Sequence, residues 1–366
     1  MINMGMVGGG PGSMIGDIHR LAAVTTGKVR LVCGAFSKSM SKSLEKGREI
    51  GLKEDRIYSS VDEMIAHELT LPQEDRMHFL AITTPNHLHV DAAKTALKSG
   101  LHVMCDKPLG INLKESLELE QEVRSSDGQF GMTYTYRGYR AIEKICEMVK
   151  EGKIGKVRKV MVDYTQGWLT DLIEKEGNKQ ASWRTDPKFS GAGGTIADIG
   201  THAFNLVEAV AHRQVEALSA QVSTMVAGRQ IDDDANILLQ LEGDAVGIIS
   251  VSQACAGEDN ALQVKIYGDK GGLIWHHDEP TKIIYKTRST SDTIVAEEED
   301  IDLPLELPPG HPESFFKAFE HLYDQFTDGI ISGNNHAIPG ISDGVRGMRF
   351  IEKALESSRK KEWVQF

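Results

Sequence analysis

The chain has 366 residues, a formal net charge of −12 and 40% apolar residues, so it is long enough for two domains and a sizeable core. Its acidity argues against nucleic acid or an anionic membrane surface as a partner, and no apolar run approaches the roughly 18 residues of a membrane span. The four cysteines lie far apart without a CxxC pair, so neither a disulfide framework nor a metal site is expected.

The first 133 residues alternate strand-like and helix-like segments. Short β-rich runs occur at 2–7, 29–36, 78–83, 102–105 and 129–134. Helical segments are expected at 15–26, 41–51, 61–69, after Pro85 and from Asn112. This alternation predicts a mainly parallel sheet with helices on both faces. The first strand follows the initial methionine directly, without a leader-like segment, so the expected compartment is the cytoplasm.

Five glycines lie between Gly8 and Gly16, after the first expected strand. A strand, a glycine-rich turn and a helix N-terminus form a site for a pyrophosphate, because bare backbone N–H groups can approach the anion. Gly8, Gly10 and Gly16 fit the three glycines of GxGxxG if residues 11–13 are an insertion. A flexible turn is the alternative, and the position in a βαβ series favours the nucleotide site.

The end of the second expected strand reads Phe36, Ser37 and Lys38. A dinucleotide site usually presents an acidic residue to the ribose at this point. A serine and a lysine suit the 2′-phosphate of NADP instead, so NAD and NADP both stay open, as does an ordinary polar turn.

Two polar stretches, 83–93 and 102–110, include the ends of the third and fourth expected strands. Open α/β sheets bind ligands at the carboxyl ends of their strands, so we expect Lys107 to point into that crevice. Pro108 restricts the backbone of Lys107 to extended geometry. A solvated loop lysine is the alternative.

After about residue 135 the pattern changes to long alternating strands, at 156–166, 216–226, 235–253 and 261–275. Short connections predict a predominantly antiparallel sheet. Helices expected at 195–211, 312–328 and 343–358 would cover one face. We expect a second subunit on the other face, which predicts a homodimer or homotetramer.

The segment 183–212 holds a carboxylate and an imidazole. If a helix begins after Gly194, Asp198 and His202 lie one turn apart, beside its apolar stripe. A carboxylate next to an imidazole orients the ring and keeps its proton affinity near neutrality, as a general base requires. Nearby glycines favour close approach of a ligand, and a solvent-facing pair or a capping network is the alternative.

Further residues are candidates for substrate contact. Tyr136 and Arg137 follow the last strand of the parallel sheet, where a polyol could bind, although a surface ion pair is the alternative for the arginine. Trp168, Trp183 and Arg184 precede the glycine-rich stretch. The two tryptophan rings either stack on a sugar face or simply pack in the protein. His311 either reaches the site or, as we favour, caps the following helix.

Together these motifs resemble the Gfo/Idh/MocA oxidoreductases, in order and through nearly the whole chain. They are the glycines 8, 10 and 16, the segments 84–87 and 106–108, and Gly193-Gly194 followed by Asp198 and His202. The resemblance implies an α/β chain with an N-terminal NAD(P)-binding Rossmann domain at 1–133 that contains a parallel sheet. It implies an α+β substrate-binding and oligomerisation domain at 134–366, with a large, open, mainly antiparallel sheet. Asp106, where the family more often has glutamate, and the insertion at 11–13 depart from the family pattern.

The resemblance also implies residue roles. His202 would take the hydroxyl proton, while Asp198 and Lys107 would bind the substrate and tune that base. The expected cofactor contacts are Gly8, Gly10, Pro11, Ser13, Met14, Ile15, Gly16, Ser37, Lys38, Thr83, Thr84, Pro85, Asn86, His89, Asp106, Lys107 and Pro108. The expected substrate contacts are Tyr136, Arg137, Trp168, Trp183, Arg184, Asp198, His202 and His311.

The leading expectation is therefore a dehydrogenase that uses NAD or NADP to oxidise a hydroxyl of a carbohydrate or cyclitol. One alternative is a redox-neutral enzyme that oxidises a sugar transiently to assist glycoside cleavage or elimination, with Tyr136 or His311 as the additional acid or base. Another is a catalytically silent nucleotide-binding regulator.

Overall fold

A computed structural model describes residues 1–298, 307, 310–334 and 338–366. The chain forms two compact units. The first comprises Met1–Tyr134 and Phe319–Val345, and the second comprises Thr135–Ala318 and Arg346–Phe366. The boundary after Tyr134 lies one residue from the expected position, but the division at 133/134 leaves out the return of 319–345 to the first unit.

Aromatic packing explains this return. The helix α10 (Glu313–Ser332) carries Tyr323 and Phe326, whose ring centroids lie 6.3 and 5.4 Å from that of Phe79 in the first unit. The Tyr323 hydroxyl is also 2.8 Å from Nδ1 of the buried His19. Burial of three large rings favours keeping this part of α10 with the first core.

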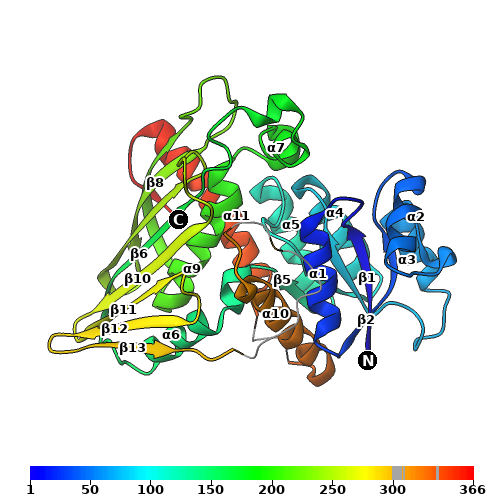
Figure 1. Ribbon diagram of the computed structural model, residues 1–366, viewed down its shortest axis with the longest axis horizontal. Coiled ribbons are helices and arrows are strands. Elements are labelled where there is room, and N and C mark those ends of the chain that lie inside the picture. The colour runs from blue at the N-terminus through cyan, green and yellow to red at the C-terminus, as the bar shows by residue number, and fades with distance from the viewer. Residues whose placement is uncertain (299–306, 308–309, 335–337) are drawn as a thin grey trace. The chain divides into compact units, whose positions relative to one another are not determined.

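The first unit contains a five-stranded sheet in the order β2-β1-β3-β4-β5, with every neighbouring pair parallel. Its strands are β1 (Ile2–Gly8), β2 (Val29–Ala35), β3 (Phe79–Thr83), β4 (His102–Cys105) and β5 (Phe130–Met132). Its helices are α1 (Met14–Thr25), α2 (Met40–Glu49), α3 (Val61–Glu68), α4 (His89–Lys98) and α5 (Leu113–Ser125), with the 3₁₀ turns η1 (Glu54–Arg56) and η2 (Asn86–Leu88). The expected parallel sheet with its alternating helices is confirmed (Figure 1).

The strand order places a topological switch between β1 and β3. The chain leaves β1 toward β2 through α1, and leaves β3 toward β4 through α4, in the opposite direction. Because such crossovers are right-handed, the two helices cover opposite faces of the sheet. Sheets of this class bind their ligands at the carboxyl ends of the strands on either side of the switch, which are β1 and β3 here.

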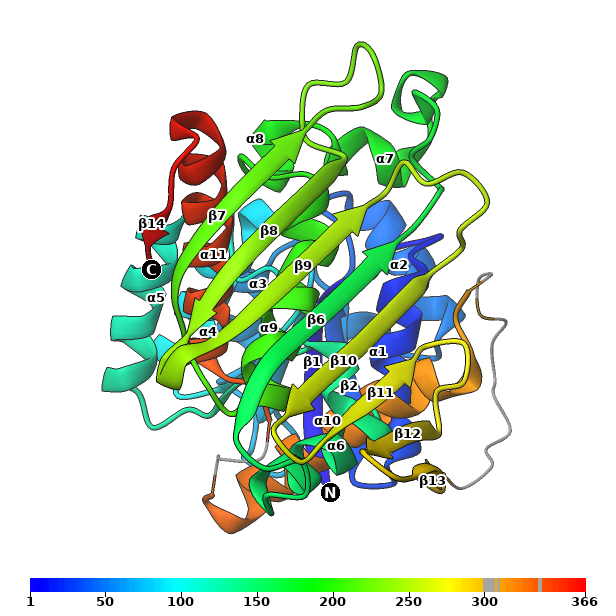
Figure 2. The same ribbon diagram turned by 90° about the vertical axis from the view of Figure 1, so that its left-hand side faces the viewer.

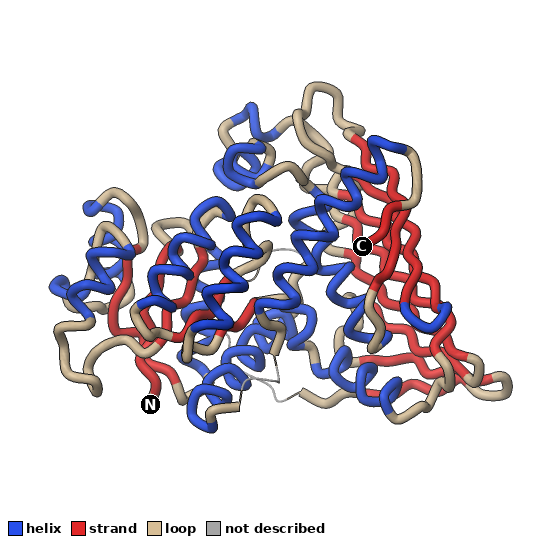
Figure 3. Tube along the Cα trace, turned by 180° about the vertical axis from the view of Figure 1, so that it is seen from behind, coloured by secondary structure: helices blue, strands red, loops and turns tan. Residues whose placement is uncertain are grey.

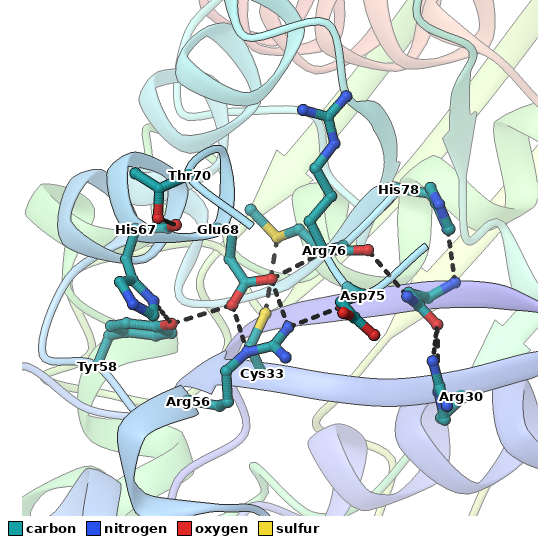
Figure 4. Close-up of polar contacts among 12 residues, drawn as sticks. Arg30, Cys33, Arg56, Tyr58, His67, Glu68, Thr70, Asp75, Arg76 and His78 are labelled. Carbon is teal, nitrogen blue, oxygen red and sulfur yellow. Dashed lines mark hydrogen bonds and ion pairs between the residues drawn. The ribbon is translucent and has the colours of Figure 1, made fainter. Parts of the chain in front are cut away.

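A buried ion pair stabilises the opposite end of the first unit (Figure 4). The Arg56 guanidinium donates twice to the Glu68 carboxylate, with both distances 2.6 Å. Tyr58 donates its hydroxyl proton to the same carboxylate at 3.0 Å, and the backbone N–H of Met77, just before β3, donates at 3.0 Å. These bonds fix α3 to the amino end of β3, so we assign this cluster to stability.

The second unit contains a nine-stranded sheet in the order β13-β12-β11-β10-β6-β9-β8-β7-β14. Its strands are β6 (Val157–Thr165), β7 (Val215–Ser223), β8 (Asp234–Leu241), β9 (Ala245–Ser252), β10 (Ala261–Gly268), β11 (Gly271–His276), β12 (Lys282–Thr287), β13 (Ser291–Val295) and β14 (Val364–Gln365). Among the described strands of this nine-stranded sheet, only β6 and β9 pair in parallel, so the expected mainly antiparallel sheet is confirmed. The short outer strands β12, β13 and β14 were not expected, because short strands without a clear alternating pattern give little periodic signal.

The described helices of this unit gather on one face of the sheet (Figure 3), and the other face is turned to the viewer in Figure 2. They are α6 (Arg140–Lys150), α7 (Lys179–Arg184), α8 (Pro187–Ser190), α9 (Thr201–Ala211) and the second part of α11 (Ile341–Lys360). This unit also contains the short turns η3 (Thr135–Gly138), η4 (Ile173–Glu176) and η6 (Glu242–Asp244), the last of which joins β8 to β9. α9 packs on β6, β9 and β10. The expected helix at 195–211 begins with a π-helical segment, η5 (Ile196–Gly200), before it continues as α9.

No helix among the described residues has the length and apolarity needed to cross a bilayer. The same residues contain no cluster of three or more potential metal ligands.

Candidate active site

The glycine loop joins β1 to α1 at the carboxyl end of the parallel sheet. β1 ends at Gly8, and α1 begins at Met14 with Ser13 as its N-cap. The Ser13 hydroxyl accepts a hydrogen bond from the backbone N–H of Gly16 at 3.3 Å. The loop therefore presents bare backbone and the N-terminus of a helix, which is the arrangement that binds a pyrophosphate.

Close backbone contacts explain why these positions are glycine. A Cβ added at Gly10 would lie 2.7 Å from the carbonyl oxygen of Phe36. A Cβ added at Gly16 would lie less than 3.0 Å from the Cα of Gly9, a distance that real Cβ atoms essentially never show. Gly8 has φ +87°, a conformation that favours glycine. The loop thus fits a dinucleotide, with the residues at 11–13 enlarging it.

The end of β2 offers polar groups near this loop without a carboxylate. Ser37 is half-buried and accepts a hydrogen bond from the backbone N–H of Ser39 at 3.2 Å, while Lys38 is exposed. This arrangement leaves both ribose hydroxyls and a 2′-phosphate as possible ligands.

His89 ties together two of the expected cofactor segments. Its Nε2 lies 2.7 Å from the carbonyl oxygen of Thr84, after β3, and its Nδ1 lies 2.8 Å from that of Pro108, after β4. Thr83 donates to the Val7 carbonyl at 3.1 Å. The ends of β1, β3 and β4 are therefore linked at one edge of the sheet.

Asp106 fixes the backbone next to Lys107. Its Oδ1 accepts from the Lys107 N–H at 2.9 Å and from the Thr133 hydroxyl at 2.8 Å. Its Oδ2 lies 3.9 Å from Nε2 of His19, whose pKa is lowered by burial, an effect that the Asp106 charge opposes. His19 was missed from the sequence, although a histidine on a largely apolar helix was a visible signal.

Asp232 anchors the segment that carries the second set of candidate residues. Its two carboxylate oxygens accept from the backbone N–H groups of Gly194 at 2.6 Å and Ile196 at 2.8 Å. Burial raises the pKa of Asp232 to about 6. This cap before η5 was also missed, because its partners lie more than thirty residues away in the sequence.

Asp198 lies on η5 and is held by an amide. Gln253, just after β9, donates from Nε2 to Asp198 Oδ2 at 2.9 Å. Arg184 Nε lies 3.7 Å from the same oxygen, and this guanidinium sits 4.3 Å from the centre of the Trp183 ring. Asp198 therefore has an amide donor on one side and a cation on another.

His202 lies one turn further along, on α9, and is 7% exposed. Its ring and the Tyr136 ring meet in a T-shaped arrangement, with centroids 5.0 Å apart and planes at 83°. This contact places the aromatic ring of Tyr136 directly beside the imidazole of His202.

The Tyr136 hydroxyl belongs to a closed ring of hydrogen bonds. Tyr164 donates its only proton to Asn260 Oδ1 at 2.6 Å, so the 2.5 Å contact between the two tyrosines must be donated by Tyr136. Asn260 Nδ2 then donates back to Tyr136 at 3.2 Å and closes the ring. Burial raises the pKa of Tyr136 to about 12. The proton of the Tyr136 hydroxyl is therefore used inside the protein, and its oxygen can act toward a substrate only as an acceptor.

The remaining candidates are placed as follows. Trp168 donates its indole N–H to Gln166 Oε1 at 3.1 Å. Arg137 is half-buried in η3, next to Tyr136. His311 packs its ring edge on Phe315, with centroids 4.6 Å apart, just before and inside the first turn of α10. Lys107 belongs to the first unit, whereas Asp198 and His202 belong to the second.

Comparisons with known proteins match both parts of the chain. Residues 2–134 match the oxidoreductase family with an NAD-binding Rossmann fold, and residues 142–274 match the GFO/IDH/MocA C-terminal domain. A solved oxidoreductase from Sinorhizobium meliloti is 35% identical with a TM-score of 0.86, and the match covers 99% of both chains. An inositol dehydrogenase homolog from Azotobacter vinelandii, solved with NADH and myo-inositol, is 28% identical with a TM-score of 0.88 over 100% of this chain and 97% of that one. Levoglucosan dehydrogenase from Pseudarthrobacter phenanthrenivorans is 24% identical over 79% of this chain and 80% of that protein.

Proposed function

Because the chain belongs to the Gfo/Idh/MocA oxidoreductase family, we propose that it is an NAD(P)-dependent dehydrogenase that oxidises a hydroxyl of a carbohydrate or cyclitol. The observation that carries this proposal is the pair Asp198 and His202, one helical turn apart and supported by buried polar and aromatic residues. The names of the inositol and levoglucosan relatives support the substrate class.

Each residue of the proposed triad has a distinct task. His202 takes the proton of the reacting hydroxyl, a general-base role typically worth about 10² to 10⁴ in rate. Asp198 accepts a hydrogen bond from the substrate and orients the base. The Lys107 ammonium stabilises the negative charge that develops on the substrate oxygen. NAD(P), when bound, supplies the hydride acceptor.

The cofactor is held, in this proposal, by the glycine loop, by the segment 83–86 and His89, and by the backbone around Lys107. Ser37 and Lys38 support use of NADP as well as NAD, because neither residue repels a 2′-phosphate. We expect the enzyme to act in the cytoplasm, where these cofactors are available.

The test is a panel of inositols, anhydrosugars, free sugars and glycosides, each mixed with NAD or NADP and followed by absorbance of the reduced nucleotide. His202→Asn should lower kcat/KM by about 10² or more, in line with loss of a general base. His212→Asn is the matched control, because His212 lies at the exposed end of the same helix in a left-handed conformation that asparagine tolerates. If no substrate of the panel yields reduced nucleotide and the protein also binds neither NAD nor NADP, the proposal is refuted.

The redox-neutral alternative is less well supported by the site. One of its two candidate acids, Tyr136, has its hydroxyl closed in a ring of hydrogen bonds. Cofactor that copurifies, with glycoside cleavage and no net reduced nucleotide, would favour this alternative.

The open face of the large sheet supports the further proposal that the protein is a homodimer or homotetramer. This face is turned to the viewer in Figure 2. Leu238, Ile248 and Met161 occupy one row across β8, β9 and β6. Leu238 is 50% exposed and the adjacent Val246 is 46% exposed. An apolar row of this kind is stabilised when a second copy covers it.

A further inference from the structure

Gln253 is a buried amide that contacts Asp198 and two further polar side chains. It is 2% exposed and lies directly after β9. Its Oε1 accepts from the Thr195 hydroxyl at 2.9 Å, and its Nε2 donates to Asp198 Oδ2 at 2.9 Å and to Gln166 Oε1 at 3.0 Å. Both amide protons and one oxygen lone pair are therefore used inside the protein.

The direction of this amide is set by a tryptophan. An indole N–H can only donate, and Trp168 donates to Gln166 Oε1 at 3.1 Å. This contact turns the oxygen of Gln166 toward Trp168 and Gln253, while its Nε2 donates to Asn260 Oδ1 at 2.7 Å. A flipped Gln253 would place its oxygen against two acceptors, the Gln166 oxygen and the Asp198 carboxylate, so the donor must face Asp198.

We propose that Gln253 is the positioning residue for Asp198 and that Trp168, through Gln166, fixes the direction of its amide. This inference rests on the proposed dehydrogenase function and extends it. The chain of amides holds Asp198 as a hydrogen-bond acceptor, so a substrate hydroxyl would donate a hydrogen bond to it. It also gives Trp168 an orienting task through its N–H, in place of the expected stacking on a sugar face.

Other charged and titratable groups also face Asp198. Arg184 Nε lies 3.7 Å from Oδ2, and the Asp198 charge contributes, after burial, to the raised pKa of both Tyr136 and Tyr164. His202 follows on the next turn, and Asp232 caps the preceding backbone. A substitution at Gln253 replaces none of these groups, so a change in titration can be assigned to position 253.

The central variant is Gln253→Glu, which keeps the shape of the side chain and places a second carboxylate against Asp198. Two adjacent carboxylates cannot both ionise readily, so one pKa of the pair rises. We expect the acidic limb of the kcat/KM profile to move up by about one pH unit or more. Gln253→Leu should lower kcat by about 10- to 100-fold, as expected for loss of a hydrogen bond to a charged group, with cofactor binding unchanged. Gln121→Glu, on the exposed surface of α5, is the control with the same charge change.

Trp168→Phe tests whether Trp168 acts by orienting the Gln166 amide through its N–H or by stacking its ring on the substrate. Phenylalanine keeps an aromatic face but has no N–H, so our proposal predicts a several-fold lower kcat, whereas a sugar-stacking role predicts little change. Equal kcat in wild type and Trp168→Phe would overturn the part of the proposal that concerns Trp168.

A measurement independent of turnover uses the holoenzyme labelled at the aspartate side-chain carboxyl carbon with ¹³C. The Asp198 resonance is assigned by its loss in Asp198→Asn. A higher apparent pKa of this carboxyl in Gln253→Glu, by about one unit, is the expected result. An unchanged titration, or wild-type pH profiles in both Gln253 variants, would overturn the inference while leaving the dehydrogenase function intact. A wild-type enzyme that reduces no cofactor, with the titration shifted as expected, would refute only the proposed function.

Discussion

Gly16→Ala tests whether the glycine loop is built for a dinucleotide. Gly16 lies in the first turn of α1, where an added Cβ would overlap the Cα of Gly9 and lie 3.1 Å from the Ser13 hydroxyl. The overlapped atom belongs to the backbone, so the turn or the start of the helix must move.

The magnitude follows from what this movement does to a bound pyrophosphate. Loss of two charge-assisted N–H contacts, at about 1.5 to 3 kcal/mol each, would weaken binding by about 3 to 6 kcal/mol. This corresponds to an increase of about 10² to 10⁴ in Kd. Titration calorimetry with NADH and NADPH measures the effect, and thermal unfolding checks that the variant is folded.

Gly12→Ala is the matched control in the same loop. Gly12 has φ +74°, but nothing lies within 4 Å of its added Cβ. The substitution carries only the left-handed backbone penalty of about 1 to 2 kcal/mol. Binding by Gly16→Ala within threefold of the wild type, or a larger loss in Gly12→Ala than in Gly16→Ala, would refute the reasoning.

Three further predictions concern stability and assembly. Arg56→Ala leaves the Glu68 carboxylate buried without its ion-pair partner, so the free energy of unfolding in urea should fall by about 3 to 5 kcal/mol, and a loss below about 1 kcal/mol would contradict the assignment. Burial raises the folded-state pKa of Asp232 to about 6, so its contribution to stability is present below about pH 4 and is lost as the pH rises through about 6. Between about pH 4 and 7 the wild type should therefore lose about 2 kcal/mol more than Asp232→Asn, and parallel pH curves would contradict this. Leu238→Asp should shift the sedimentation coefficient toward that of the monomer. Leu69→Asp, at an exposed position of the first unit, is the control and should leave the coefficient unchanged. An unchanged coefficient for Leu238→Asp would place the interface elsewhere.

The sequence was most informative where the signal was local. The five strands of the first unit, the glycine loop and the one-turn spacing of Asp198 and His202 all follow from short-range periodicity and turn chemistry. The return of 319–345 to the first core could not be foreseen, because it depends on packing between α10 and β3.

The supporting residues of the site were hidden for the same reason. Gln253 reaches Asp198 across 55 positions of sequence, and Asp232 reaches Gly194 across 38. Polar residues at the ends of apolar strands, such as Gln166 and Gln253, were the available signal. Their directions depend on hydrogen bonds that only the folded chain creates. The hydroxyl of Tyr136, whose proton goes to Tyr164, shows this most clearly.

Hydride transfer itself is the central claim, and isotope transfer tests it most directly. Incubation with a panel substrate deuterated at its ring carbons, such as perdeuterated myo-inositol, and with NAD or NADP should place one deuterium at C4 of the reduced nicotinamide, and His202→Asn should suppress this transfer. Oxidised substrate without deuterium on the nicotinamide, or deuterium transfer unaffected by His202→Asn, would contradict the account.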